Sequence, residues 1–101
     1  MDSSNIYIIK KDNTKEAFNV QKVVVAVRKS AERELYHFSE KELEYICDFV
    51  NRKCEEMDHQ FIPIARMHNV VEGALDHVNP MVAKSYRDYR NYKQDFVQML
   101  D

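Results

Sequence analysis

The chain has 101 residues, of which 45% are apolar and 32% charged; its formal net charge is −2 and its only glycine is Gly73. A chain of this length can bury roughly two thirds of its unfolded surface in one core, so a single domain is expected. Glycine-rich phosphate loops are excluded, because they need several glycines to bring the backbone close to a phosphate. No apolar run approaches the ~20 residues that span a bilayer, and no signal peptide is evident, so we expect a soluble, cytoplasmic protein.

Charge is unevenly distributed along the chain. Residues 1–31 carry a net charge of +3, whereas residues 32–58 carry −5 and the remainder is balanced. A globally basic nucleic-acid-binding protein is therefore disfavoured, and no membrane partner is expected. The local excess of positive charge leaves an anion-binding site near the N-terminus open.

The first elements in chain order are two short strands. Residues 6–10, Ile-Tyr-Ile-Ile-Lys, are rich in β-branched and aromatic types, and residues 16–18 follow a polar run. This pattern predicts a hairpin. Asp12 and Asn13 tolerate a left-handed backbone, so the turn can form without glycine. Two short strands are marginal alone and must pack on the rest of the chain.

Two helices are predicted next. The first begins after Asn19, a good N-cap, and keeps apolar residues at helical spacing as far as Ala31. The second begins after Ser39, which forms a capping box with Glu42 three residues later, and it extends to Met57.

The second half of the chain predicts one more strand and two more helices. Residues 60–62 are short and apolar and precede Pro63, which is expected to be the first residue of a helix that ends at Val78. Gly73 lies within this helix and marks a close helix contact. A fourth helix is capped by Asn79, begins at Pro80 and keeps its apolar spacing through residue 100. The predicted fold is α+β, mainly α, a helical bundle with a small sheet.

Few residues suggest catalytic chemistry. No serine or cysteine stands in a nucleophile elbow, so we expect no enzymatic activity from this chain alone. Cys47 and Cys54 share one predicted helix about 10 Å apart, too far for a disulfide, and are interpreted as core thiols, with a metal or redox role as the alternative. The four histidines lack zinc-site spacing, and no metal site is predicted.

Lysines of the N-terminal segment are more informative. Lys10 and Lys11 end the first strand, Lys15 precedes the second, and Lys22 lies in the first turn of the first helix. Lys22 would lean over a helix N-terminus, where exposed N–H groups and the helix dipole favour a phosphate. A solvated lysine face is the alternative interpretation. Strand alternation would send Lys10 and Lys11 to opposite faces.

The last predicted helix offers a second cluster, in which basic residues alternate with tyrosines. Aromatic and basic side chains at helical spacing can stack on a base or bind a phosphate. A tyrosine stripe can equally be part of a core, with its hydroxyls reaching water. The cluster comprises Tyr86, Arg87, Tyr89, Arg90, Tyr92 and Lys93.

Three motifs occur together in this chain: Ile-Ile-Lys-Lys-Asp-Asn at residues 8–13, Phe18-Asn19 with Lys22, and Val-Ala-Lys-Ser-Tyr-Arg-Asp-Tyr-Arg at residues 82–90. Together they resemble the ATP-cone, the regulatory nucleotide-binding module at the N-terminus of many ribonucleotide reductase large subunits. The resemblance covers about residues 5–96 and implies one regulatory domain over residues 1–101. It implies a four-helix bundle capped by a three-stranded sheet, with ATP or dATP between the sheet and the helices.

The resemblance also assigns candidate nucleotide contacts. In the first strand and turn these are Ile8, Lys10 and Lys11. In the next elements Glu16, Asn19 and Lys22 resemble the base, sugar and phosphate contacts. From the last helix, the candidates are Tyr89, Arg90 and Lys93. Magnesium is a candidate companion of the phosphates, although the sequence shows no carboxylate cage.

The sequence departs from the family pattern at three places. Lys11 stands where the family often has arginine. The planar guanidinium group of arginine is thereby replaced by the compact ammonium group of lysine. Asn13 substitutes for the usual turn glycine. Pro63-Ile64 stands where a serine or threonine often opens the third helix, so one polar contact is missing.

We therefore expect an allosteric domain that binds ATP as activator and dATP as inhibitor and controls the overall activity of a ribonucleotide reductase. Its expected partners are the nucleotide, a reductase catalytic domain or subunit, and a second copy of the chain. The four-cysteine zinc ribbon of related repressors and the catalytic cysteines of a reductase are absent, so the chain corresponds to the regulatory domain alone, as a fragment or a free-standing cone. The alternative is a helical protein-interaction module without a nucleotide site, in which the acidic second helix docks onto a partner.

Overall fold

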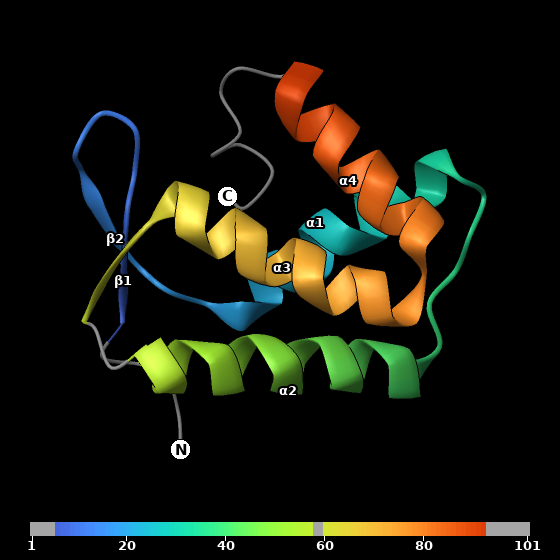
Figure 1. Ribbon diagram of the computed structural model, residues 1–101, viewed down its shortest axis with the longest axis horizontal. Helices are drawn as coiled ribbons and strands as arrows, with labels where there is room; N and C mark the ends of the chain where they lie inside the picture. Colours follow the sequence, from blue (N-terminus) through green and yellow to red (C-terminus); the bar gives the residue numbers. More distant parts are fainter. Residues whose placement is uncertain (1–5, 58–59, 93–101) are drawn as a thin grey trace.

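A computed structural model describes residues 6–57 and 60–92, with side chains as far as residue 88. Four helices and three short strands follow one another in the predicted order (Figure 1). Their bounds are β1 Tyr7–Ile9, β2 Lys15–Ala17, α1 Val20–Arg33, α2 Glu40–Met57, β3 Phe61–Pro63, α3 Ile64–Val78 and α4 Pro80–Tyr92. The predicted extension of the last helix to residue 100 lies outside the described residues.

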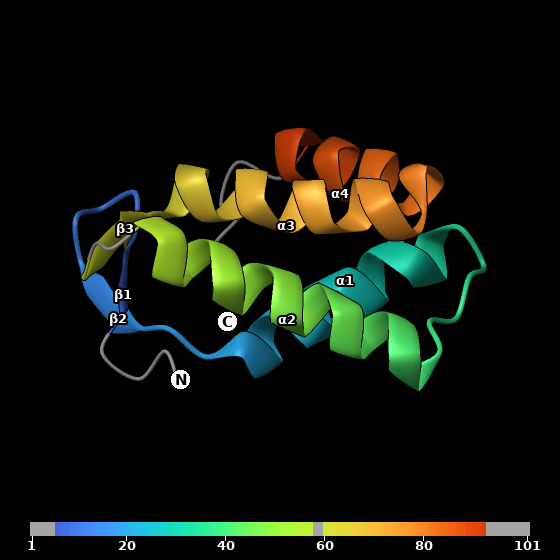
Figure 2. The same cartoon turned by 60° about the horizontal axis from the view of Figure 1, so that its bottom comes forward.

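The helices form a bundle, and the sheet lies at one end of it. Helices α1 and α3 both pack against α2 and against α4. Figures 1 and 2 show the sheet beyond the first turn of α3 and near the C-terminal end of α2. The mainly helical α+β class with a small mixed sheet is thereby confirmed.

The sheet has the strand order β2-β1-β3. β1 pairs antiparallel with β2, with Ile8 opposite Glu16, and parallel with β3, with Ile8 opposite Ile62. Asn13 adopts the left-handed conformation at φ 69°, and Asp12 accepts hydrogen bonds from the Thr14 amide and hydroxyl at 3.1 and 2.7 Å. These bonds confirm that the hairpin turn forms without glycine.

The predicted helix caps are present. The Asn19 side chain accepts a hydrogen bond from the Gln21 amide at 2.9 Å. The Ser39 hydroxyl accepts from the Glu42 amide while the Glu42 carboxylate accepts from the Ser39 amide, which completes the capping box. Asn79 caps α4 through a bond from the Met81 amide at 3.0 Å.

The boundary between the third strand and the third helix was predicted wrongly. Pro63 was expected to be the first helical residue, but it is the last residue of β3, and α3 begins at Ile64. The ψ of Pro63 is 143°, an extended value, because Pro63 pairs in register with Ile9 of β1. Sheet pairing thus outweighs the preference of proline for the first helical position.

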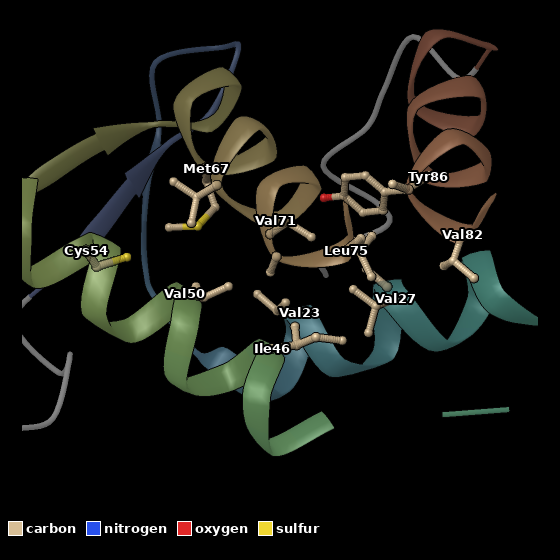
Figure 3. Packing of buried hydrophobic residues seen from close by; sticks show 14 of the residues in the cluster. Val23, Val27, Ile46, Val50, Cys54, Met67, Val71, Leu75, Val82 and Tyr86 are labelled. Carbon is tan, nitrogen blue, oxygen red and sulfur yellow. The ribbon is translucent and has the colours of Figure 1, made fainter. Parts of the chain in front are cut away.

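The core runs along the bundle interior, where all four helices contribute side chains (Figure 3). Cys54 is buried here, and burial raises the pKa of its thiol to about 11, as expected for a core thiol. Tyr86 is fully buried and its hydroxyl lies 3.3 Å from His68 Nδ1, so this tyrosine belongs to the core.

Candidate functional site

A pocket lies between the sheet and the first turns of α1 and α3. Its cavity volume is about 30 Å³, and it opens to solvent. The sheet contributes residues from β1 and β2, and the segment between β2 and α1 forms one side. The polar lining residues are Lys10, Glu16, Asn19 and Lys22, and the apolar ones are Ile8, Ala17, Phe18, Val23, Ile64 and Met67.

Glu16 links the two lysines of the pocket. Its Oε1 lies 2.5 Å from Lys10 Nζ, and its Oε2 accepts a hydrogen bond from Lys22 Nζ. The hydrogen bonds from Lys10 and, next, from Lys22 lower the pKa of Glu16 from 4.5 to about 2. The carboxylate is therefore ionised at neutral pH and shares its charge between two cations.

The N-terminus of α1 forms the neighbouring side of the pocket. Asn19 caps this end, and the first turn of α1 contains no acidic residue. No acidic side chain of the first turn therefore neutralises the positive end of the helix dipole, and Lys22 adds a positive charge to the same turn. This end of the pocket suits an anionic ligand group such as a phosphate.

The opposite side of the pocket is apolar. Ile8 and Ile64 are buried, and Met67 and Val23 are fully buried beneath them. Ile64 is the first residue of α3, where many family members are expected to have a serine or threonine. This wall therefore offers a ligand dispersion contacts and no side-chain hydrogen bond. Such a wall suits a flat apolar group, for example a nucleobase ring.

Five of the nine predicted site residues line the pocket together: Ile8, Lys10, Glu16, Asn19 and Lys22. Lys11 does not line it. β1 ends at Ile9, and Lys11 is an exposed residue of the hairpin turn. Tyr89 and Arg90 lie in the last turns of α4, where only the backbone is described, and Lys93 lies outside the described residues.

The apolar wall was not predicted as part of the site. Phe18, Val23 and Met67 were not among the candidate site residues. Each of them does pack on the core, yet each also faces the pocket. Phe18 and Val23 could have been predicted to line the pocket, because they lie on either side of Asn19 in the sequence, at the helix start where the anion site was expected.

Among residues 6–57 and 60–92, no group of three or more histidine, cysteine, aspartate or glutamate side chains could hold a metal ion. Within the same part of the chain, no helix is both long and apolar enough to cross a membrane.

The pocket has lysines at one end and apolar side chains at the other, an arrangement that would suit a ligand with an anionic part and a ring. The family model of the ATP cone domain matches residues 6–95, nearly the whole chain. The chain therefore belongs to the ATP cone domain family. It is a nucleotide-binding regulatory domain, not a catalytic one, and the effectors of such domains are ATP and dATP. A comparison with curated proteins found no match.

Proposed function

We propose that this chain binds ATP or dATP in the pocket between the sheet and helices α1 and α3, and that it thereby controls the overall activity of a ribonucleotide reductase. The observation that carries the first part is the joint placement of Lys10, Lys22 and the α1 N-terminus beside an apolar wall. The second part rests on the family, whose members include regulatory domains of reductases.

Each predicted residue has a role in this proposal. Lys10 and Lys22 bind the phosphates, together with the amides at the start of α1. Glu16 and Asn19 contact the sugar or base, and Ile8 packs against the base. Lys11 reaches the outer phosphate from the hairpin turn. The last helix adds contacts from Tyr89, Arg90 and Lys93, and magnesium accompanies the phosphates.

Regulation requires that the two nucleotides favour different conformations or assemblies. ATP and dATP differ by one hydroxyl, and a coupling free energy of about 1–3 kcal/mol between nucleotide and partner would be enough for a switch. The partner in this proposal is a reductase catalytic domain or subunit, with a second copy of this chain as a further partner. Residues 1–101 act as one regulatory domain in the cytoplasm.

Thermal unfolding tests nucleotide binding. Ligand at a hundred times its dissociation constant stabilises a fold by about 2.7 kcal/mol, which raises the Tm of a domain this small by roughly ten degrees or more. We expect this shift with millimolar ATP and dATP, with and without magnesium. Absence of a shift with every nucleotide would contradict the proposal and would favour the protein-interaction hypothesis.

Lys22→Ala tests the position of the site. A charge-assisted hydrogen bond is worth about 1.5–3 kcal/mol, so we expect a loss of about tenfold or more in ATP affinity by isothermal titration. Lys84→Ala is the matched control, because Lys84 is an exposed lysine of α4 that pairs with Asp88. Equal affinities of the two variants would remove Lys22 from the site.

The link to a reductase needs a separate assay. Reductase subunits from the same organism are assayed for ribonucleotide reduction with and without the chain, in the presence of ATP or dATP. We expect the chain to make the activity respond to the choice of nucleotide. The same response with and without the chain would contradict the reductase proposal while leaving nucleotide binding intact.

A further inference from the structure

The carboxylate of Glu16 occupies the position between the two ammonium groups that a phosphate would need. Each of its oxygens takes one lysine, Lys10 through Oε1 and Lys22 through Oε2. Its side chain is 30% exposed, so the bridge is partly shielded from water. Before any ligand arrives, the positive charges of the pocket therefore already have an anionic partner.

This arrangement opposes the binding of a bare polyphosphate. Phosphate oxygens must replace both ion pairs of Glu16, so the new contacts largely substitute for existing ones. The displaced carboxylate also stays on β2 beside the incoming anion, and a like charge placed there is unfavourable. The net gain from phosphate contacts is therefore smaller than it would be without the Glu16 carboxylate.

A nucleoside offsets this cost in two ways. A ribose or deoxyribose hydroxyl can donate a hydrogen bond to the displaced Glu16 carboxylate, which gives the charge a new partner. The base can cover accessible apolar surface of the pocket, such as that of Ala17 and Phe18, which the phosphates cannot use. Both gains are available only to a ligand that carries a sugar and a base.

We propose that Glu16 is a specificity-determining residue, which makes the pocket select nucleoside triphosphates and reject bare polyphosphates. The inference rests on the proposed nucleotide site. Selectivity arises because the carboxylate competes with every phosphate group but becomes a hydrogen-bond acceptor for the sugar alone. Specificity here is a difference between two affinities, obtained partly by disfavouring the wrong ligand.

The test compares ATP with inorganic tripolyphosphate by isothermal titration at low salt and neutral pH. Glu16→Gln removes the charge and keeps the size of the side chain. We expect this variant to bind tripolyphosphate about tenfold or more tightly than the wild type, and the ratio of ATP to tripolyphosphate affinity to fall by about tenfold or more. Glu44→Gln, at an exposed position on α2, has the same change in net charge and should leave the ratio unchanged.

Circular dichroism checks that Glu16→Gln is folded. Should it fail to fold, Glu16→Asp keeps the charge but is one methylene shorter, too short to reach both lysines at once, and it should also lower the ratio. An unchanged ratio in the folded variant, or an equal gain for both ligands, overturns the inference while ATP binding by the wild type stands. Failure of the wild type to bind ATP overturns the proposed function and this inference with it.

Discussion

Glu16 and Lys22 form an ion pair across the junction between β2 and α1. Only Phe18 and Asn19 separate these two elements, and Asn19 fixes the start of the helix through its cap. Because the connection is so short, the direction of the first turn of α1 sets where the Lys22 ammonium lies relative to the sheet. The polar half of the pocket is thus built from one contiguous stretch, residues 10–22, and depends little on long-range packing.

The depressed pKa of Glu16 predicts a pH-dependent contribution to stability. The pKa is about 2 in the folded chain and 4.5 in the reference state, so the folded form favours the ionised carboxylate. This contribution is fully present above about pH 4.5 and is lost as the pH falls through the folded pKa near 2. We expect the wild type to exceed Glu16→Gln in unfolding free energy by about 1 kcal/mol at pH 6, a modest value because both ion pairs are partly exposed.

Urea unfolding between pH 2 and pH 7 measures this effect. The difference between the wild type and Glu16→Gln should shrink progressively below pH 4.5, whereas Glu44→Gln should follow the wild type throughout. The difference between variants is the informative quantity, because the pKa values of Asp12 and Glu42 are also lowered, by hydrogen bonds from Thr14 and Tyr36 respectively. A difference that does not depend on pH would show that ionisation of the Glu16 carboxyl does not contribute to the stability of the fold.

Lys10 and Lys11 are neighbours in sequence but differ in position. Lys10 is half-buried and lines the pocket, whereas Lys11 is exposed in the hairpin turn. We expect Lys10→Ala to lower ATP affinity by about tenfold or more, and Lys11→Ala to lower it several-fold less, because an exposed charge contributes weakly. Isothermal titration of the two variants side by side gives the ranking, and a reversed order would mean that Lys11 is the principal phosphate ligand.

Much of the fold could be predicted because its boundaries are set by local rules. Asn19, Ser39 and Asn79 satisfy the amides of helix starts a few residues away, and the Asp12-Asn13 turn needs only a left-handed backbone and a short side chain. These interactions span two to four residues, so they are visible in the sequence. For the same reason the lysines and Glu16, which lie within one short stretch, could be brought together before the structure was known.

The failures have a common physical cause, which is dependence on partners distant in sequence. Pro63 stays extended because it pairs with Ile9, more than fifty residues earlier. Met67 and Ile64 line the pocket because β3 places the start of α3 beside the hairpin. Met67 is fully buried, but an inward-facing side chain can face either a core or a pocket, and helical periodicity does not separate the two.

The helix contact at Gly73 leaves room for a methyl group, although a mid-helix glycine suggested a closer approach. The helix contact is present, since a Cβ added at Gly73 would lie 3.5 Å from the Phe49 ring, an ordinary van der Waals distance. No glycine in the described chain has a positive φ. We therefore expect Gly73→Ala to raise the unfolding free energy by about 0.5–1 kcal/mol, the usual gain from removing a mid-helix glycine.

Chemical denaturation of Gly73→Ala measures this gain. The matched control is Ala74→Gly, the opposite change at the next residue of α3, which is fully buried and should lose about 1 kcal/mol or more. A decrease in stability for Gly73→Ala would mean that the Phe49 ring cannot accept even one methyl group, and that the glycine is required for α2 and α3 to approach.

Leu35 ends α1 in an unfavourable way. Its φ is 57°, in the left-handed region, and its side chain is 90% exposed. The Leu35 amide donates to the Glu32 carbonyl and the Tyr36 amide donates to the Ala31 carbonyl, which is the Schellman pattern that glycine normally completes. The left-handed conformation of a leucine lowers the free energy of unfolding by about 1–2 kcal/mol, and an exposed side chain offsets little of this loss through packing.

We expect Leu35→Gly to raise the unfolding free energy by about 1 kcal/mol, after a few tenths are lost to the greater freedom of glycine in the unfolded chain. For a domain of this size, a gain of 1 kcal/mol raises the Tm by about 4–8 °C. Glu34→Gly is the matched control, because Glu34 has a φ of −102° and gains nothing from glycine, so its Tm should fall. Leu35 lies at the end of α1 away from the pocket, and ATP affinity should stay unchanged. A lower Tm for Leu35→Gly would show that the leucine side chain stabilises the chain by a contact that outweighs the backbone strain, for example in an assembly of several copies, and dilution of the wild type would then lower its Tm as well.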